Sequence, residues 1–292
     1  MKVLRNLIAI GLVFLVVFSS GCSIKSTSGN VPSSSNLTVK MLDVGQGDAF
    51  LIKTSQQVIL LDTGDIDARD LLVNKLKAEG ITKIDKLIIT HPHADHLGGA
   101  MGVLMNFDVK SVYDNGQITT TSTYRKYIKK VTDSKIPYKQ LLAGEHLDFG
   151  DGIKFIVYSP TKRMIDMEED LNNNSIVGKL KYGDFSILFT GDSESAIEKE
   201  LLNKYKDELK STILKSPHHG SKTSSNNAYL KAISPECVLI SVGTGNDYKH
   251  PHETTLNKYK KLNFKIYRTD FDGTVTITSD GHGYNVVKEK AQ

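Results

Sequence analysis

Histidine side chains are concentrated in three short segments of this chain. Seven of the nine histidines lie in the groups His91/His93/His96, His218/His219 and His250/His252. Imidazole is the commonest metal ligand in proteins and also serves as a general acid or base near neutral pH. Histidines at such short spacing therefore predict a metal-dependent or acid–base site built from segments that are far apart in the sequence.

The first group has the richest set of ligands. In the segment His91-Pro-His93-Ala-Asp95-His96, four metal-ligating side chains directly follow the apolar run 86–90. Alternate side chains at the end of a strand point the same way, so His91 and His93 can face one metal ion. Asp95 and His96 begin the next helix and face a second position. Such ligands suit zinc, manganese or iron. Asp95 alone would also suit a helix N-cap, but the density of ligands favours a metal site.

The apolar pattern predicts the elements that must position these groups. Strands are expected over residues 37–42, 49–54, 58–61, 86–90, 109–113, 153–158, 175–180, 185–190 and 212–215. Helices are expected over 68–78 and 194–205, and the alternation continues through 228–233, 238–242, 254–262 and 264–267. Strands 274–278 and 284–287 flank a turn at Asp280-Gly281. We therefore expect an α/β domain over 37–292, with two packed mixed β-sheets and helices on their outer faces.

The ordered motifs resemble those of the metallo-β-lactamase superfamily. The His-x-His-x-Asp-His pattern after a buried strand is the signature of that superfamily, and Asp62-Thr63-Gly64, Gly191-Asp192 and His218-His219-Gly220 follow strands where its other marks occur. The resemblance implies an αβ/βα sandwich with its site at one edge of the sheets. It also implies that Asp62 orients the histidine loop.

A narrower resemblance is to the soluble hydrolase domain of ComEC-type DNA-uptake proteins. It rests on the segments 41–49, 172–175, 217–221 and 248–252. That domain is thought to degrade the DNA strand that is not imported. Because the resemblance is to the hydrolase domain alone, it implies a stand-alone hydrolase. The substrate that we expect is DNA or another phosphodiester.

The resemblance also assigns roles to the metal ligands. His91 and His93 are expected at a first metal ion, and Asp95 and His96 at a second, with Asp192 between the two ions. One of His218 and His219 completes the second site. His219 is favoured because it directly precedes Gly220, which would leave His218 to support a ligand. The expected cofactor is one or two divalent ions, zinc or manganese, which would activate a water molecule.

The superfamily's third histidine for the first metal ion is missing. Asn172–Asn174 and Ser175 occupy its expected place, and Asn174 or Ser175 offers an oxygen ligand instead. A plain polar loop is the alternative for this segment. The first site is accordingly expected to be weak, to prefer a harder ion such as Mn²⁺, or to fill only with substrate.

Other polar residues are expected to support the reaction. Asp95 and His252 are the groups we expect to take part in catalysis. His252 is placed ahead of His250 for holding a phosphate or protonating the leaving oxygen, because it opens a helix. Asp43 and Asp48 are expected to support the ligands from behind. A proline-flanked surface turn is the alternative for the two histidines.

The first 36 residues have the composition of an export signal and a tether. Lys2 and Arg5 precede a short apolar run, and Ser19-Ser20-Gly21-Cys22 resembles the lipobox of bacterial lipoproteins. We expect residues 1–21 to be a lipoprotein signal peptide, Cys22 the lipidated residue and residues 22–36 a flexible serine-rich linker. The domain would then lie outside the cytoplasmic membrane on a lipid anchor, or be secreted if Cys22 is not lipidated.

Composition excludes several classes of protein. Hydrophobic residues make up 39% of the chain and charged residues 24%, which excludes wholesale disorder and a polytopic membrane protein. Two cysteines exclude a disulfide scaffold, and a net charge of +4 gives no sign of a dedicated DNA-binding protein. An exported phosphodiesterase or nuclease is the leading hypothesis. The alternatives are hydrolysis of another substrate such as a lactam, and a catalytically silent lipoprotein that binds DNA or a protein partner, which the sequence does not identify.

Overall fold

The computed structural model describes residues 36–167 and 170–290. The predicted signal peptide, Cys22 and the linker up to residue 35 lie outside the described residues. No helix within the two described ranges is both long and apolar enough to cross a membrane. The described residues form one compact unit.

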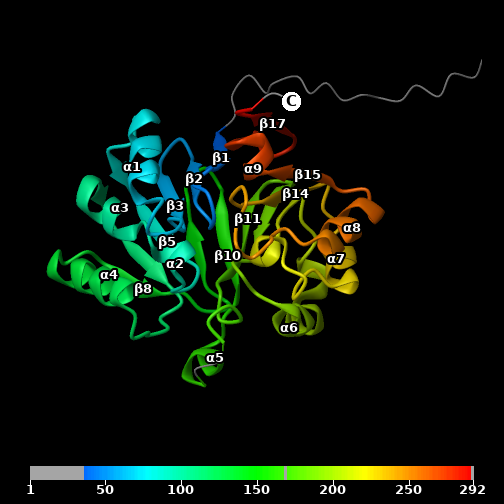
Figure 1. Ribbon diagram of the computed structural model, residues 1–292, viewed down its shortest axis with the longest axis horizontal. Helices are drawn as coiled ribbons and strands as arrows, with labels where there is room; N and C mark the ends of the chain where they lie inside the picture. Colours follow the sequence, from blue (N-terminus) through cyan, green and yellow to red (C-terminus); the bar gives the residue numbers. More distant parts are fainter. Residues whose placement is uncertain (1–35, 168–169, 291–292) are drawn as a thin grey trace, which may run out of the picture. The chain divides into compact units, whose positions relative to one another are not determined.

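Two mixed β-sheets form the centre of the structure (Figure 1). In spatial order, the first sheet contains β17 (Tyr284–Lys288), β16 (Val275–Ser279), β1 (Leu37–Met41), β2 (Phe50–Lys53), β3 (Val58–Leu61), β5 (Lys86–Ile89), β7 (Val112–Asp114) and β8 (Tyr138–Gln140). The second contains β15 (Lys265–Arg268), β14 (Cys237–Ile240), β13 (Ile213–Lys215), β12 (Phe185–Phe189), β11 (Val177–Tyr182), β10 (Lys154–Ser159) and β9 (His146–Asp148). A short parallel pair, β4 (Lys83–Ile84) and β6 (Asp108–Val109), stands apart from both sheets.

Each sheet is antiparallel at one end and parallel at the other. In the first sheet the strands from β17 to β3 are antiparallel, and those from β3 to β8 are parallel. In the second, β9 to β12 are antiparallel and β12 to β15 are parallel. Parallel neighbours end at the same edge of a sheet, so the loops that follow β3, β5, β12 and β13 can converge there.

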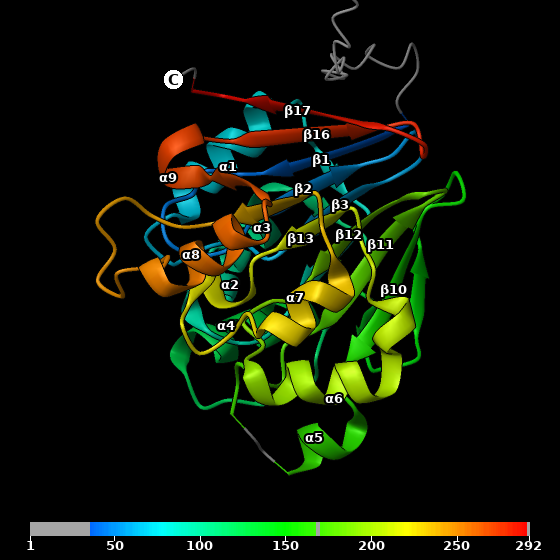
Figure 2. The same ribbon diagram turned by 90° about the vertical axis from the view of Figure 1, so that its right-hand side faces the viewer.

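Helices cover the outer faces of the two sheets (Figures 1 and 2). The first sheet packs against α1 (Arg69–Ala78), α3 (Ala100–Asn106) and α4 (Ser122–Asp133), and the second against α6 (Ser195–Tyr205), α7 (Asn227–Ile233) and α8 (Glu253–Lys261). Short helices α2 (Ala94–Leu97), α5 (Lys162–Asp166) and α9 (Thr269–Asp272) lie in connections. The expected sandwich with outer helices is confirmed.

The main core lies between the sheets. Alternate residues of both sheets face it, among them Val39, Phe50 and Ile88 from the first sheet and Phe155 and Phe189 from the second. The ring of Phe50 meets the ring of Phe189 edge to face, with centroids 5.1 Å apart. Alternation along the strands sends the intervening side chains outward onto the helices.

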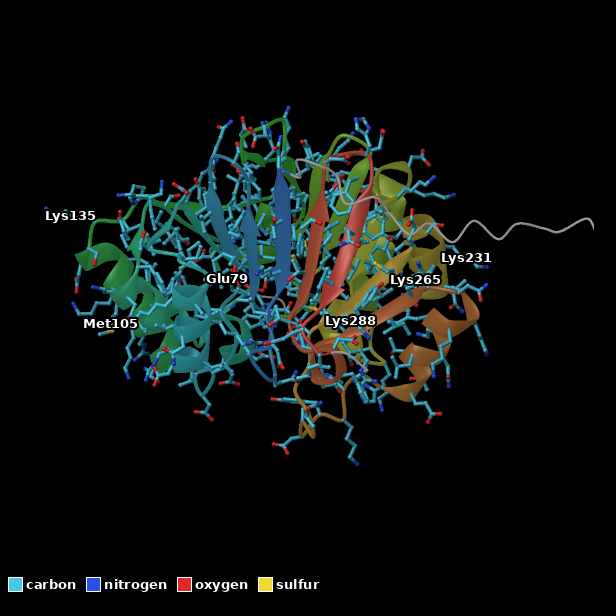
Figure 3. All side chains as sticks on the ribbon, turned by 90° about the horizontal axis from the view of Figure 1, so that it is seen from above. Glu79, Met105, Lys135, Lys231, Lys265 and Lys288 are labelled. Carbon is cyan, nitrogen blue, oxygen red and sulfur yellow. The ribbon has the colours of Figure 1, made fainter. Side chains whose placement is uncertain are left out.

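The two ends of the described chain meet in the first sheet. Strand β1 pairs with β16 along its whole length, so Leu37 lies opposite Ser279. Viewed from above, the blue strand β1 lies beside the red strands β16 and β17 (Figure 3). The predicted closing hairpin is present, with β16 and β17 antiparallel.

Several elements differ from the sequence prediction. The single strand expected over 109–113 is two short strands, β6 and β7, which belong to different sheets. Helices α3, α4, α5 and α9 and strands β4, β8 and β9 were not predicted. These elements lie at the edges and outer faces of the sandwich, where short or weakly apolar segments are stabilised by packing instead of by their own periodicity.

Candidate metal centre

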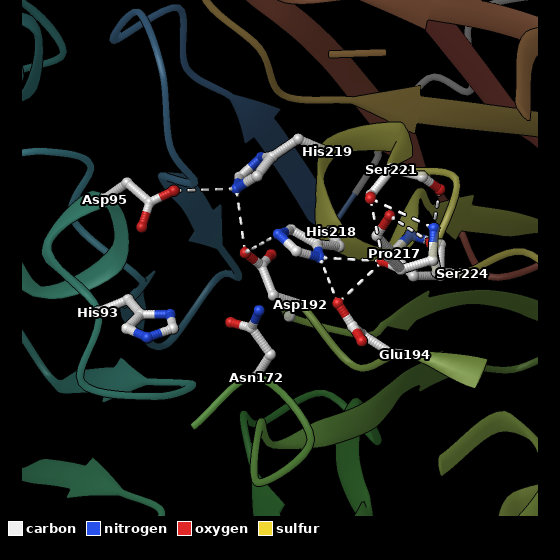
Figure 4. A network of polar contacts seen from close by, with 12 residues as sticks. His93, Asp95, Asn172, Asp192, Glu194, Pro217, His218, His219, Ser221 and Ser224 are labelled. Carbon is white, nitrogen blue, oxygen red and sulfur yellow. Dashed lines mark hydrogen bonds and ion pairs between the residues drawn. The ribbon is translucent and has the colours of Figure 1, made fainter. Parts of the chain in front are cut away.

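Four loops that follow parallel strands converge at one edge of the sandwich. Asp62 follows β3, the segment 91–96 follows β5, Asp192 follows β12, and His218 and His219 follow β13. The two halves of the chain therefore bring ligand-type side chains together from both sheets (Figure 4).

Two imidazoles and two carboxylates form a tight cluster at this edge. The ligand atoms of Asp95, His96, Asp192 and His219 all lie within 4.8 Å of one another. His96 Nε2 lies 3.2 Å from one oxygen of Asp192, and His219 Nε2 lies 3.3 Å from the other. His219 Nε2 is also 3.2 Å from Asp95 Oδ2. These are the four residues that the sequence predicts for the second metal ion.

The imidazoles are oriented through their other ring nitrogen. His96 Nδ1 donates to Asp62 Oδ2 at 2.8 Å, and His219 Nδ1 donates to the carbonyl oxygen of Ser241 at 2.8 Å. Asp62 is itself held by the backbone N–H of Thr90 at 2.7 Å. Such support fixes the tautomer and presents Nε2 to a metal ion. The contacts of Asp62 agree with the orienting role that the resemblance implies.

Three of these residues have an unusual backbone conformation. Asp62, His218 and His219 all have positive φ, at 59°, 48° and 50°. Residues other than glycine rarely adopt this region because the backbone is strained there. Such strain persists where the surrounding structure fixes a functional side chain. The left-handed turn separates the two histidines. His219 points into the cluster, whereas His218 Nδ1 bonds Glu194 at 3.0 Å and its Nε2 stays 3.8 Å from Asp192.

The charges of the cluster are strongly coupled. Burial opposes protonation of His219, but the Asp192 carboxylate outweighs it and raises the pKa of His219 to about 10. Burial likewise opposes protonation of His96, yet Asp192 and Asp95 raise its pKa well above the usual value. Burial would raise the pKa of Asp192, but His219, His96 and Lys215 hold it well below its ordinary range. Without a metal ion, the cluster therefore holds protons where a cation would fit.

The donor set fits a divalent metal ion. His96 Nε2, His219 Nε2 and Asp192 Oδ1 are all buried, and among the described residues they face one another as ion pairs without a hydrogen bond of regular geometry. Unsatisfied buried polar atoms are costly, and they cluster where an ion belongs. Two imidazole nitrogens and carboxylate oxygens match the ligands of zinc and manganese sites.

His91 and His93 lie next to this cluster and form a second, poorer group. His91 Nε2 is 3.1 Å from His93 Nδ1, and the ring of His91 lies 4.2 Å from that of His96. Burial is the main cause that lowers the pKa of His91 well below its usual value, with the charge on His96 adding to it. His91 is therefore a neutral imidazole suited to a metal ion.

The structure places Asn172, rather than Asn174 or Ser175, beside these histidines. Asn172 lines the pocket, and its Oδ1 is buried with no hydrogen-bond partner among the described residues. Ser175 Oγ instead accepts the backbone N–H of Asp192 at 3.0 Å, and Asn174 is wholly buried behind the pocket. Ser175 thus supports Asp192 from behind, and the turn at 172–174 directs the first asparagine inward (Figure 4).

A pocket of about 340 Å³ opens over the cluster. Its walls are polar and aromatic, with Gln46, Asp65, His93, Ala94, Asp95, Asn172, Asp192, His218, His219, Tyr248 and His250. His250 lines it, whereas His252 caps α8 and accepts the backbone N–H of Lys222 at 3.1 Å. The geometry therefore favours His250 over His252 as the histidine that faces a substrate.

The two remaining predicted carboxylates have different positions. Asp48 is buried beneath the cluster, 3.5 Å from His219 Nδ1. Asp43 is not part of the site, because it holds the turn at Gly45 and pairs with Lys290 at 3.2 Å. Both follow strand β1, but only Asp48 lies on the part of the loop that turns toward the segment 91–96.

Lys215 is a buried cation that the sequence analysis missed. Its Nζ lies 2.6 Å from Asp48 Oδ2 and 3.5 Å from Asp192 Oδ1, and it donates to the carbonyl oxygen of Gly191 at 2.9 Å. Burial lowers the pKa of a lysine, but Asp48 and Asp192 raise that of Lys215 above its ordinary value. A lysine at the end of an apolar strand normally indicates an exposed strand end, so the sequence carried no signal for this role.

Known proteins resemble this chain both in sequence and in fold. A profile of the metallo-β-lactamase superfamily matches residues 42–244. ComE operon protein 3 of Bacillus subtilis (strain 168) is 29% identical and competence protein ComA of Neisseria gonorrhoeae 32% identical, over 83% and 81% of this chain. The matches cover 33% and 31% of those proteins, so this chain spans about a third of their length.

Solved structures share the fold at low sequence identity. The diiron β-hydroxylase CmlA of Streptomyces venezuelae matches with a TM-score of 0.53 and 13% identity, over 88% of this chain and 55% of CmlA. The metallo-β-lactamase fold protein YhfI of Bacillus subtilis matches with a TM-score of 0.51 and 12% identity, over 80% of this chain and 96% of YhfI.

Proposed function

Because the chain belongs to the metallo-β-lactamase superfamily of metallo-hydrolases, we propose that it is a metal-dependent phosphodiesterase that cleaves DNA. The observation that carries this proposal is the convergence of Asp95, His96, Asp192 and His219 at the floor of an open polar pocket. A lactam or another acyl compound is the alternative substrate, and the similarity to a competence protein favours DNA over it.

The similarity to a competence protein supports DNA as the substrate. One relative, competence protein ComA, has a name that refers to competence, and the similarity to it covers 81% of this chain. Only about a third of that relative is matched, so the transfer of a substrate from it is part of the proposal.

The residues of the chain have distinct tasks in the proposed reaction. Asp95, His96, Asp192 and His219 would hold one divalent ion, and His91, His93 and Asn172 would offer ligands to a second. Such ions lower the pKa of a water molecule and neutralise charge on a phosphodiester. His250 faces the same pocket, and its buried Nδ1 has no hydrogen-bond partner among the described residues.

His250 is the group we propose for interaction with the phosphodiester. Burial and the neighbouring His219 and His218 lower its pKa to about 4, so it is neutral at physiological pH. A neutral imidazole can donate a hydrogen bond from one ring nitrogen to a phosphate oxygen, while its other ring nitrogen accepts one.

We also propose that the enzyme acts outside the cytoplasmic membrane on a lipid anchor at Cys22. This part rests on residues 1–36 of the sequence alone. Metabolic labelling with a palmitate analogue should mark the wild-type chain and leave a Cys22→Ala variant unlabelled. Labelling that persists in the variant would contradict the anchor.

The test of the enzymatic proposal is turnover by the full chain, purified in detergent. With Mn²⁺ or Zn²⁺ it should cleave bis-p-nitrophenyl phosphate and DNA. Asp192→Ala and His93→Ala should lower the rate at least about 100-fold, since each removes a proposed ligand. Asp184→Ala, which changes an exposed carboxylate far from the pocket, is the matched control.

Three outcomes would reject the proposal. The first is the absence of phosphodiester turnover with any metal ion, and the second is full activity of Asp192→Ala and His93→Ala. The third is hydrolysis of nitrocefin without cleavage of any phosphodiester, which would indicate a lactam-type substrate. Elemental analysis that finds less than about one ion per chain would instead favour a silent binding protein.

A further inference from the structure

Tyr248 is an exposed aromatic residue at the mouth of the metal pocket. Its side chain is part of the pocket wall, together with Asp192, His218 and His219, although the residue is 64% exposed. Single exposed aromatic residues are common, so what distinguishes Tyr248 is its position in the wall of the metal pocket. Nothing in the proposed hydrolysis of a phosphodiester uses this ring.

One side of the Tyr248 ring is supported by a neighbour. The ring of His250 lies 5.7 Å from it, centroid to centroid, at an interplanar angle of 21°. His250 is only 9% exposed, so its buried ring supports one face of the tyrosine ring in a fixed position. The ring therefore has one face backed by the protein, while the residue as a whole stays largely open to solvent.

The segment that carries Tyr248 is held by the side chain of Asn246. Its Nδ2 donates to the carbonyl oxygens of Gly243 and His250, at 3.0 and 2.7 Å. Its Oδ1 accepts the backbone N–H of His250 at 3.0 Å. These three bonds close the ends of the segment on one another, and the connection between β14 and α8 that contains Tyr248 projects from the fold (Figure 2).

We propose that Tyr248 is a platform on which a base of single-stranded nucleic acid stacks while the adjoining phosphodiester lies over the metal centre. The proposal rests on the proposed function and narrows its substrate class. Every nucleobase has a flat face that stacks on an aromatic ring without regard to sequence. In a duplex both faces of a base are covered by its neighbours, so only an unpaired or frayed strand can use such a platform.

The pocket wall beside Tyr248 carries Asp65, Asp95 and Asp192, so a bound metal ion is needed to offset their charge toward a nucleic-acid backbone. Lys249, which follows Tyr248, and Lys222, whose backbone N–H bonds His252, are both exposed, and Asp247 precedes Tyr248. None of the described ion pairs involves either lysine or Asp247. Phosphate contacts of this kind position the strand, while stacking supplies the interaction with the base.

The experiment compares binding of intact and abasic DNA by the full chain loaded with Mn²⁺, using strands with phosphorothioate linkages that resist cleavage. Fluorescence anisotropy gives the Kd for a labelled single-stranded oligonucleotide and for an abasic oligonucleotide of equal length. Wild-type protein should bind the intact strand more tightly. Tyr248→Ala should raise the Kd for the intact strand roughly 5- to 100-fold and bring it close to the abasic value.

Two further variants separate stacking from a structural role. Tyr248→Phe keeps the flat ring and should bind like the wild type. Phe271→Ala removes an exposed aromatic residue that lines a different groove, and should leave both Kd values unchanged. An equal loss of affinity for intact and abasic strands in Tyr248→Ala would overturn the proposal, because it would indicate a role in holding the loop.

Failure of this inference and failure of the proposed function give different results. If Tyr248→Ala binds intact single strands as well as the wild type does, the platform is refuted, whatever the enzyme hydrolyses. If the metal-loaded wild type cleaves no phosphodiester, the proposed function is refuted by turnover alone. Tighter binding of duplex than of single strands by the wild type would also overturn the inference.

Discussion

At the residue scale, the cluster is arranged to exchange protons for a metal ion. His96 and His219 each use Nδ1 for a hydrogen bond to the protein, so only Nε2 is left for a ligand. In the described structure each Nε2 faces Asp192 instead. The carboxylate favours the protonated imidazole, which means that a cation must compete with protons for the same nitrogen atoms.

Metal affinity should therefore increase with pH. The Asp192 carboxylate raises the pKa of His219 to about 10, and Asp192 and Asp95 raise the pKa of His96 well above its usual value, so both imidazoles favour a proton in the metal-free protein. Each displaced proton makes the apparent affinity up to about tenfold tighter per pH unit below its pKa. Calorimetric titration in two buffers of different ionisation enthalpy should show about two protons released per ion at pH 7.

The control for this prediction is His219→Ala, which should release about one proton fewer per ion, in addition to binding more weakly. An apparent metal affinity that stays constant between pH 6 and pH 8 would contradict the protonated state of the two imidazoles.

Lys215 should be important for stability, although it contacts no substrate. Lys215→Met leaves the buried carboxylate of Asp48 without its cation, and removal of one partner of a buried pair costs about 3–5 kcal/mol in the free energy of unfolding. The double variant Lys215→Met/Asp48→Asn removes both charges and should recover part of that loss. Urea denaturation gives the free energy of unfolding of the wild type, the single variant and the double variant. Equal stability of the single and double variants would show that the pair is not coupled.

At the element scale, the loop between β1 and β2 fits closely against the metal-ligand segment. The backbone N–H of Asp48 donates to the carbonyl oxygen of Asp95 at 3.1 Å. A Cβ atom on Gly47 would lie 2.1 Å from that same oxygen, and φ at this residue is +111°. The glycine thus allows two loops from different strands to meet directly behind a metal ligand.

Gly47→Ala should weaken metal binding as well as the fold. The added methyl group must displace Asp95, so we expect metal affinity to fall at least about tenfold and stability to fall by about 1–3 kcal/mol. Gly45→Ala is the matched control, because Gly45 also has positive φ but a Cβ there meets nothing within 4 Å. Titration calorimetry gives the metal affinity, and thermal unfolding gives the stability. Equal losses in the two variants would show that only backbone strain matters.

At the scale of the whole molecule, the site joins the two sheets. Asp95 and His96 follow β5 of the first sheet, while Asp192 and His219 follow β12 and β13 of the second. The main apolar core holds the sheets together along their length, and the cluster lies at their common edge. A bound ion would therefore connect the two halves of the chain through four side chains.

Removal of metal ion should lower the thermal stability of the whole domain. An ion at about 100 times its Kd stabilises the folded state by about 2.7 kcal/mol, which corresponds to a Tm higher by roughly 5–10 °C. Differential scanning calorimetry with and without chelator measures the shift. The double variant Asp192→Ala/His219→Ala should show no difference in Tm with and without chelator. Asp184→Ala/His282→Ala, which removes an exposed histidine–carboxylate pair, should keep the difference. An unchanged Tm after chelation would contradict a metal ion that connects the two halves of the chain.

The sequence predicted much of the fold because its strongest signals are local. Buried strands such as 58–61 and 185–189 are apolar runs of strand length, and their periodicity can be recognised without knowledge of their neighbours. Helix α4 is missing from the predicted elements, although Thr121 caps it and Tyr124, Tyr127 and Val131 are spaced along one face. Its polar, β-branched residues weaken the intrinsic preference for helix, so packing on the first sheet stabilises it.

The ligand types were also readable from the sequence, because histidine and aspartate at these spacings after strands have few other uses. Their final positions depended on tertiary structure. A left-handed turn directs His219 inward and His218 toward Glu194, a turn at 172–174 brings Asn172 to the pocket, and Asp43 points away to Lys290. Lys215 became part of the site only because two buried carboxylates from distant strands surround it. Residue types and spacing determine which atoms are available, but only the packing of the two sheets decides which of them meet.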